Sequence, residues 1–135
     1  MVLNGTATEQ AGDDERVRLF LYARVLAICH ANVVYVGPSA VDYQPRRMNF
    51  LWVRWYDQVD LGRTGWDARK LDRVRFPSLS GSAGDGPFGF IDPVLVLRAC
   101  HIIPRFCKGK RYEDGKGMSF CGRDSSDWNE YYINR

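Results

Sequence analysis

The stretch "NFLWVRWYDQVDLGRTGW", residues 49–66, carries three of the four tryptophans of this 135-residue chain. Its first half alternates in the manner of a β-strand, in which successive side chains point to opposite faces. Leu51 and Val53 therefore share a face, and because both are apolar we expect that face to contact the core. Trp55 follows on the same face, either within the core or at its rim.

The opposite face of this strand combines one arginine with aromatic side chains: Phe50, Trp52, Arg54 and Tyr56. Two arrangements fit that pattern. Trp52 and Tyr56 are either partly exposed, or buried under a neighbouring loop with Arg54 stacked on them. The first arrangement provides a binding surface, and the second provides a packed core.

The flanking segments also favour strands. Residues 21–36, "LYARVLAICHANVVYV", are rich in β-branched and aromatic side chains. This composition predicts two strands or one long bent strand, with a helix over 17–26 as the alternative. Shorter strands are expected within 70–76 and 99–106, because turn-forming residues separate these apolar segments.

Two segments favour short helices. Asp92 is a good N-cap and Pro93 a good first helical residue, which predicts one or two helical turns there. Near the C-terminus, Trp128, Tyr131 and Tyr132 are spaced as the stripe of an amphipathic helix. The whole pattern predicts a mainly β fold, or β-dominated α+β, with a small, strongly bent sheet or partly open barrel.

The length of the chain suits one domain. Residues 1–16 are polar and acidic without periodicity, so we expect a disordered leader before a single β-rich domain over 17–135. The apolar runs are too short to cross a membrane, and the N-terminus lacks signal-peptide features. We therefore expect an intracellular protein with no membrane partner.

Charge is unevenly distributed along the chain. Its formal net charge is +3, but residues 1–15 hold four of the 16 acidic residues and no lysine or arginine. The remaining 120 residues carry a net charge of +7, which suits a phosphate-binding surface, although solubilising charge is the alternative. The predicted nucleic-acid-binding residues are Arg46, Arg47, Arg69, Lys70, Lys108, Lys110 and Arg111.

The chain carries few groups that suit metal binding. A zinc site from Cys100, His101, Cys107 and Cys121 is conceivable, but the sequence has no C-x-x-C spacing. Alternation in "ACHII" would also point Cys100 and His101 to opposite faces. We expect no metal and no cofactor, and interpret most of the four cysteines as small buried hydrophobes.

Catalytic patterns are equally scarce. His30 and His101 both lie in apolar, strand-like runs, where structural histidines are commoner than catalytic ones. The glycine-rich segment "GSAGDGPFG" lacks the Lys-Ser/Thr pair of a phosphate loop. We therefore predict that the chain is not an enzyme.

The ordered series "YARVLAICHANVVYVGPSAVDY", "FLWVRWYDQVD", "GWDARKLDRVRFP", "FGFIDPVLVLRACHIIPRFCKGKR" and "DSSDWNEYYINR" resembles the C-terminal region of basidiomycete fungal proteins associated with Plavaka-type DNA transposons. This resemblance covers residues 21–135. In those proteins a transposase-like part lies upstream. The resemblance implies a transposon-derived, nuclear protein of which this chain is a C-terminal domain.

A second similarity, in "YARVLAI", "LWVRWYDQ" and "DPVLVLRACHIIP", is to the bromo-adjacent homology (BAH) domain of chromatin proteins. It implies an elaborated β-barrel that binds nucleosomes, histone tails or protein partners. Tyr22 and Trp55 match aromatic positions of the methyl-lysine cage found in some members. Trp52, Tyr56 and Trp66 are further cage candidates, and Asp57 would accept a hydrogen bond from a lower-methylated ammonium.

Two functions follow from these observations. The first is a non-catalytic recognition module that binds a histone tail, a nucleosomal surface or DNA. The second is a structural domain that packs against the upstream transposase-like part and has no ligand of its own.

Overall fold

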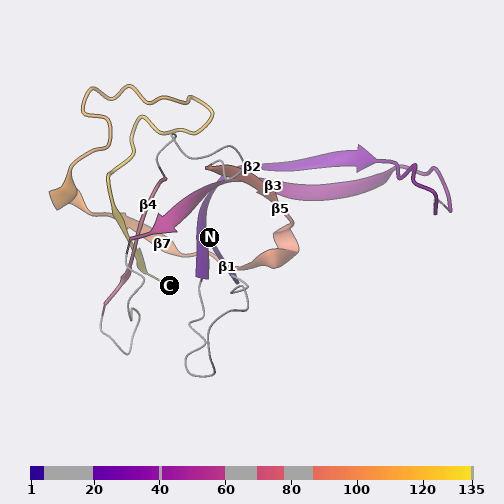
Figure 1. Cartoon of the computed structure of the whole chain (residues 1–135), viewed down its shortest axis with the longest axis horizontal. Coiled ribbons are helices and arrows are strands. Elements are labelled where there is room, and N and C mark those ends of the chain that lie inside the picture. Colours follow the sequence, from indigo (N-terminus) through magenta and orange to yellow (C-terminus); the bar gives the residue numbers. More distant parts are fainter. Residues whose placement is uncertain (5–19, 40, 60–69, 78–86, 135) are drawn as a thin grey trace.

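The computed structural model describes residues 1–4, 20–39, 41–59, 70–77 and 87–134. Within these ranges, eight strands form one sheet in the order β6-β1-β2-β3-β4-β8-β7, with β5 pairing to β3 (Figure 1). All pairings are antiparallel. The strands are β1 (Val2–Asn4), β2 (Phe20–Val33), β3 (Arg46–Gln58), β4 (Asp72–Arg75), β5 (Phe88–Ile91), β6 (Val96–Arg98), β7 (His101–Pro104) and β8 (Tyr131–Asn134). The predicted mainly β fold is confirmed.

The sheet is strongly curled. Its two edge strands, β6 and β7, are separated in sequence by only Ala99 and Cys100. The Cα atoms of Arg98 and His101 are three peptide units apart, so at most about 11 Å separates them. The edges must therefore approach each other, although the sheet order does not pair them. A bent, open sheet is thus the observed form of the predicted architecture.

The two longest strands, β2 and β3, form a ribbon that projects from the rest of the sheet (Figure 1). The β2 strand is irregular where Val25 pairs with Val53 and Ala27 pairs with Trp52, which leaves Leu26 as a bulge. Of the two strand arrangements predicted, two strands or one long bent strand, the second is found, and the alternative helix is wrong for the described residues 20–26. We call residues 27–33 of β2 and 46–52 of β3 the arm.

In its second half, β3 contacts one hydrophobic cluster on each of its two faces. Leu51 and Val53 are buried with Ala23, and Trp55 packs against them, as predicted. We call this side of β3 the Val53 face. The side that carries Phe50, Trp52, Arg54 and Tyr56 is the Arg54 face. Tyr56 of this face lies in a second cluster, whose other buried members are Val2, Tyr22, Val74, Phe76, Tyr131 and Ile133.

The predicted C-terminal helix is wrong. Tyr131 and Ile133 are buried while Tyr132 is half-buried and Asn134 exposed, which is the two-residue period of β8. Tyr131 pairs with both Val74 of β4 and Pro104 of β7. Helical spacing was present in the sequence, but these two neighbouring strands provide backbone partners that local sequence does not reveal.

The N-terminal prediction also needs correction. Val2 and Leu3 are buried, and β1 inserts between β2 and β6. Residues 2–4 are therefore part of the sheet, because two apolar side chains there complete the core. The remainder of the predicted leader, residues 5–16, lies outside the described residues.

Two 3-10 turns complete the fold, η1 (Pro93–Leu95) and η2 (Phe106–Lys108). The Asp92 side chain accepts a hydrogen bond from Val94 N at 2.9 Å, and Pro93 opens the η1 turn, as predicted. No helix in the described part of the chain is long and apolar enough to cross a membrane.

Candidate functional site

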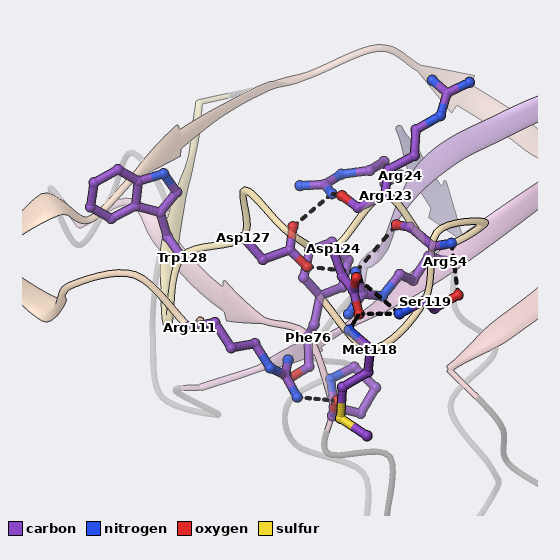
Figure 2. A network of polar contacts seen from close by, with 12 residues as sticks. Arg24, Arg54, Phe76, Arg111, Met118, Ser119, Arg123, Asp124, Asp127 and Trp128 are labelled. Carbon is purple, nitrogen blue, oxygen red and sulfur yellow. Dashed lines mark hydrogen bonds and ion pairs between the residues drawn. The ribbon is translucent and has the colours of Figure 1, made fainter. Parts of the chain in front are cut away.

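A buried carboxylate, Asp127, joins the sheet to the C-terminal loop, residues 109–130 between η2 and β8 (Figure 2). Asp127 Oδ2 lies 2.5 Å from Arg54 Nη1, and its Oδ1 lies 2.8 Å from Arg24 Nη1. The Tyr131 hydroxyl donates to Oδ1 at 3.3 Å. Several partners are needed to offset the desolvation of a buried charge, and this carboxylate has three. We call these four residues the Asp127 cluster.

Phe76 packs against the guanidinium groups of this cluster. The Arg54 Cζ atom is 3.7 Å from the centre of the Phe76 ring, and the Arg24 Cζ atom is 4.6 Å from it. Tyr56 stacks on the same ring at 4.1 Å. Of the two arrangements that the sequence left open, Arg54 and Tyr56 adopt the buried one, with cation–π contacts to Phe76. Trp52 remains half-buried.

The loop that covers the cluster is fixed by a second buried carboxylate, Asp124 (Figure 2). It accepts hydrogen bonds from the backbone nitrogens of Met118 and Ser119, both at 3.1 Å. The Ser119 hydroxyl accepts from Gly122 N at 3.0 Å, and Arg54 donates to the Gly122 carbonyl at 3.4 Å. These contacts hold the loop against the Arg54 face.

Two tyrosines in this region have altered acidity. Burial raises the pKa of the Tyr56 hydroxyl, against the opposing attraction of the Arg24 guanidinium. Burial also raises the pKa of Tyr131, against the hydrogen bond from the Trp128 backbone. Both hydroxyls are therefore neutral at physiological pH. The Tyr56 hydroxyl has no hydrogen-bond partner among the described residues.

Among the described residues, the predicted methyl-lysine cage residues do not converge. Tyr22 is 1% exposed, and its hydroxyl donates to Asp72. Tyr22 pairs with Tyr56 on the Arg54 face, whereas Trp55 pairs with Ala23 on the Val53 face, so Tyr22 and Trp55 point in opposite directions. Trp52 shares the Arg54 face, but Asp57 follows the side of Trp55, and Trp66 lies outside the described residues. Alternation thus separates the residues that the resemblance brought together.

The structure instead assembles a row of rings on the Arg54 face. Phe50 meets Phe90 edge-on with ring centres 5.5 Å apart, and Trp52 lies 5.9 Å from Phe88. Trp52 pairs directly with Phe90 in the β3–β5 register. We call these four residues the aromatic ladder. Phe90 is 70% exposed, and the other three rings are half-buried.

The two rings contributed by β5 were not identified from the sequence. The alternation in "FGF" at 88–90 was the available signal, because it puts both rings on one face. Gly89 between them leaves room for Trp55 on the other face: a Cβ atom there would lie 2.6 Å from the Trp55 Nε1 atom. Asp127, in contrast, carries no local signal of its role.

The predicted nucleic-acid-binding residues fall into separate groups. Those exposed are Arg46, Arg47, Lys70, Lys108 and Lys110, while Arg69 lies outside the described residues. Arg111 is half-buried and donates to the carbonyls of Phe76 and Pro77 at 2.9 and 3.0 Å, so it has a structural role. The arm and η2 lie at opposite ends of the molecule, so these basic residues do not form one surface (Figure 1).

The cysteines and histidines are dispersed. Cys107 and Cys121 are exposed, contrary to the expectation that most cysteines are buried, whereas Cys29 and Cys100 are half-buried. Within the described residues, no group of three or more His, Cys, Asp or Glu side chains is arranged to hold a metal ion.

Comparison of the chain with protein-family models, with curated protein sequences and with solved structures finds no match in any of the three.

Proposed function

We propose that the chain is a non-catalytic recognition domain that binds DNA in chromatin, mainly through phosphate contacts. One observation carries the proposal: among the described residues, basic side chains outnumber acidic ones at the surface. Asp72, Asp124 and Asp127 are buried, whereas Arg54 is the one buried cation of the described residues.

The exposed charges of the described ranges comprise nine basic and five acidic side chains, an excess of four positive charges. The basic ones are Arg46, Arg47, Lys70, Arg75, Arg98, Lys108, Lys110, Lys116 and Arg123. The acidic ones are Asp42, Asp57, Asp92, Glu113 and Asp114. Such an excess attracts a polyanion and increases its rate of association.

The buried polar groups support a recognition role over a catalytic one. Asp127 is engaged by two arginines and a tyrosine, and Asp124 by backbone amides, so both carboxylates stabilise the loop. A general acid or base needs a polar group that can reach substrate. The buried charges of the described residues instead stabilise the position of the loop.

A DNA partner also agrees with the resemblance of residues 21–135 to transposon-associated proteins, and a partner in chromatin implies a nuclear protein. A methyl-lysine cage has less support, because Tyr22 is buried and Trp55 lies on the other face. The alternative function, packing against an adjacent part of a parent protein, is supported by the exposed apolar residues of the arm, such as Met48.

Fluorescence anisotropy with a labelled duplex of about 20 base pairs tests the proposal across a salt series. We expect the logarithm of affinity to fall linearly with the logarithm of salt concentration. Replacing Arg46 and Arg47 by glutamate should weaken binding and make that slope shallower if the arm contributes phosphate contacts. Glu113→Gln, which removes an exposed negative charge, should not weaken binding.

Two results would contradict a DNA partner. One is affinity that is indifferent to salt, and the other is binding of histone peptides without binding of DNA. If the domain bound neither duplex DNA, single-stranded DNA nor histone peptides, the packing function would be favoured.

A further inference from the structure

We propose that the aromatic ladder is a binding site for single-stranded DNA, whose unpaired bases stack on its exposed rings. This inference rests on the proposed function and names the form of nucleic acid that the Arg54 face accepts. Base stacking on sheet-borne aromatic side chains is a general mode of single-strand recognition, because every base presents a π-face.

The first observation is the position of the rings. Phe88 and Phe90 on β5 interleave with Trp52 and Phe50 on β3, and the register places them on one face. A ladder that served only as core would be sealed, but the Phe90 ring is 70% exposed. The face thus offers stacking surface in a continuous row.

The same face continues along the arm as an apolar surface. The Leu26 bulge shifts the alternation of β2, so Cys29 and Val33 pair with Phe50 and Arg46 on the Arg54 face. Met48 of β3 lies between those positions and is exposed. From Arg46 to Arg54 the strand covers about 26 Å, enough for several nucleotides.

The second observation is the charge at each end of the row. Arg46 lies at the outer end, and its pairing with Asp42 at 3.3 Å is an exposed contact that a phosphate can replace at low cost. At the inner end, a Cβ atom on Gly122 would lie 3.1 Å from the Phe88 Cζ atom, so the loop that carries the next residue, Arg123, contacts the ladder.

Arg123 is available for a phosphate. Its side chain is exposed, makes no ion pair with a described residue, and extends away from the buried carboxylates (Figure 2). Its φ of 50° lies in the left-handed region, which is uncommon for a residue other than glycine. Nearby, Asp124 and Asp127 are buried, so their charges do not face a ligand.

The chemistry of the face favours DNA over RNA. Between Arg46 and Arg54, the β3 side chains on this face are Met48, Phe50 and Trp52. None of the three accepts a strong hydrogen bond, so the hydrogen of a 2′-hydroxyl placed against them loses water without gaining an acceptor, and only the Trp52 indole N–H can donate to its oxygen. A deoxyribose avoids that cost.

Matched substitutions distinguish stacking from apolar docking. Phe90 and Phe106 are 70% and 67% exposed, but Phe106 packs on Trp128, away from the ladder. Leucine keeps the apolar character and removes the ring. Phe90→Leu should weaken binding of an oligothymidylate of about 20 nucleotides by roughly 5- to 150-fold, and Phe106→Leu should leave it unchanged. Equal affinities for Phe90→Leu and the wild type would overturn the inference.

A footprint provides a second measurement that does not depend on a substitution. Cys29 lies on the Arg54 face, opposite Phe50, whereas Cys107 lies in η2. Bound oligothymidylate should slow maleimide labelling of Cys29 and leave Cys107 unaffected. Unchanged Cys29 labelling at saturating oligonucleotide would place the ligand elsewhere and overturn the inference.

The remaining outcomes separate the two proposals. Binding of duplex but not of oligothymidylate would overturn the ladder site and retain DNA recognition. Tighter binding of oligouridylate than of oligothymidylate would overturn the choice of DNA. Cys29 protection that increases with protein concentration in the absence of nucleic acid would identify the face as a contact between copies of the chain, against the inference.

Discussion

Arg54 and Asp127 are 73 positions apart in the sequence, yet their side chains meet at 2.5 Å with 1% and 0% exposure. This pair ties the central strand β3 to the C-terminal loop. Arg54 also donates to the Gly122 carbonyl, so the same side chain holds Gly122 beside Phe88 of the ladder. The stability of the domain is therefore linked to the geometry of the proposed binding face.

Removing the carboxylate should be strongly destabilising. Asp127→Ala leaves two arginines without their acceptor, and an uncompensated buried charge costs about 3–5 kcal/mol. Urea unfolding followed by fluorescence measures the loss of unfolding free energy. Asp42→Asn, which breaks the exposed pair with Arg46, serves as control and should cost at most about 1 kcal/mol. Equal losses in the two variants would show that the buried pair has no special role.

Tyr56→Phe should leave stability unchanged or increase it. The Tyr56 hydroxyl is buried and has no hydrogen-bond partner among the described residues, so the wild type bears its desolvation cost. Tyr131→Phe is the matched contrast, because its hydroxyl accepts from Trp128 N at 2.8 Å and donates to Asp127. We expect that second variant to lose about 1 kcal/mol or more in urea unfolding. The reverse order of the two variants would contradict this assignment.

Alkaline pH should destabilise the domain through the same tyrosines. Burial raises the pKa of Tyr56 in the folded state, so the folded protein retains this proton more tightly than the unfolded chain. The resulting stability is present below the unfolded pKa of about 10 and is lost as pH rises above it. Unfolding free energies measured from pH 8 to about pH 11 should fall less steeply in Tyr56→Phe than in the wild type. Parallel curves would exclude a contribution from Tyr56.

The loop around Asp124 should tolerate no side chain at Gly117. A Cβ atom there would lie 1.9 Å from Asp124 Oδ1 and 2.5 Å from the backbone nitrogen of Ser125. We expect Gly117→Ala to cost about 1–3 kcal/mol in urea unfolding, because the displaced carboxylate loses its backbone donors. Lys116→Ala, at the exposed neighbouring position, should change stability by less than about 0.5 kcal/mol. A neutral Gly117→Ala variant would show that the loop rearranges freely.

Thiol reactivity should separate the four cysteines. Cys107 and Cys121 are exposed, whereas Cys29 and Cys100 are half-buried. Titration with a thiol reagent should give two fast and two slow reactions in the native protein, and four fast ones in denaturant. Mass spectrometry identifies the sites. Fast labelling of Cys100 in the native state would contradict its packing against the core.

Sequence periodicity predicted the features that local alternation controls. Leu51 and Val53 contact the core, and Asp92 caps the turn at Pro93, because these arrangements depend on neighbouring residues. The C-terminal strand could not be predicted in this way, since its partners β4 and β7 come from other parts of the chain. The spacing of Trp128, Tyr131 and Tyr132 suits a helix, but pairing with β4 and β7 makes this segment a strand.

For the candidate binding residues too, the sequence predicted local features but not contacts between distant segments. The alternation placed Trp52 correctly on the Arg54 face but could not show that Tyr56 beside it is sealed by Phe76. Nor could it show that Asp127 neutralises Arg54, because no local pattern links positions so far apart. Partners across the fold, rather than residue types, decide which rings remain accessible.

The extra residue in β2, Leu26, determines which later β2 side chains lie on each face of the projecting ribbon. With Leu26 accommodated as a bulge, Ala27 and Cys29 turn towards Trp52 and Phe50, and His30 turns the other way with Asn49. If no bulge formed and Leu26 paired with Trp52, every later β2 side chain would change face, so Ile28 and His30 would lie opposite Phe50 and Met48. The outer part of the Arg54 face would then carry the polar side chains of His30 and Asn32 in place of Ala31 and Val33, while the pairing from Tyr22 to Val25 would be unchanged.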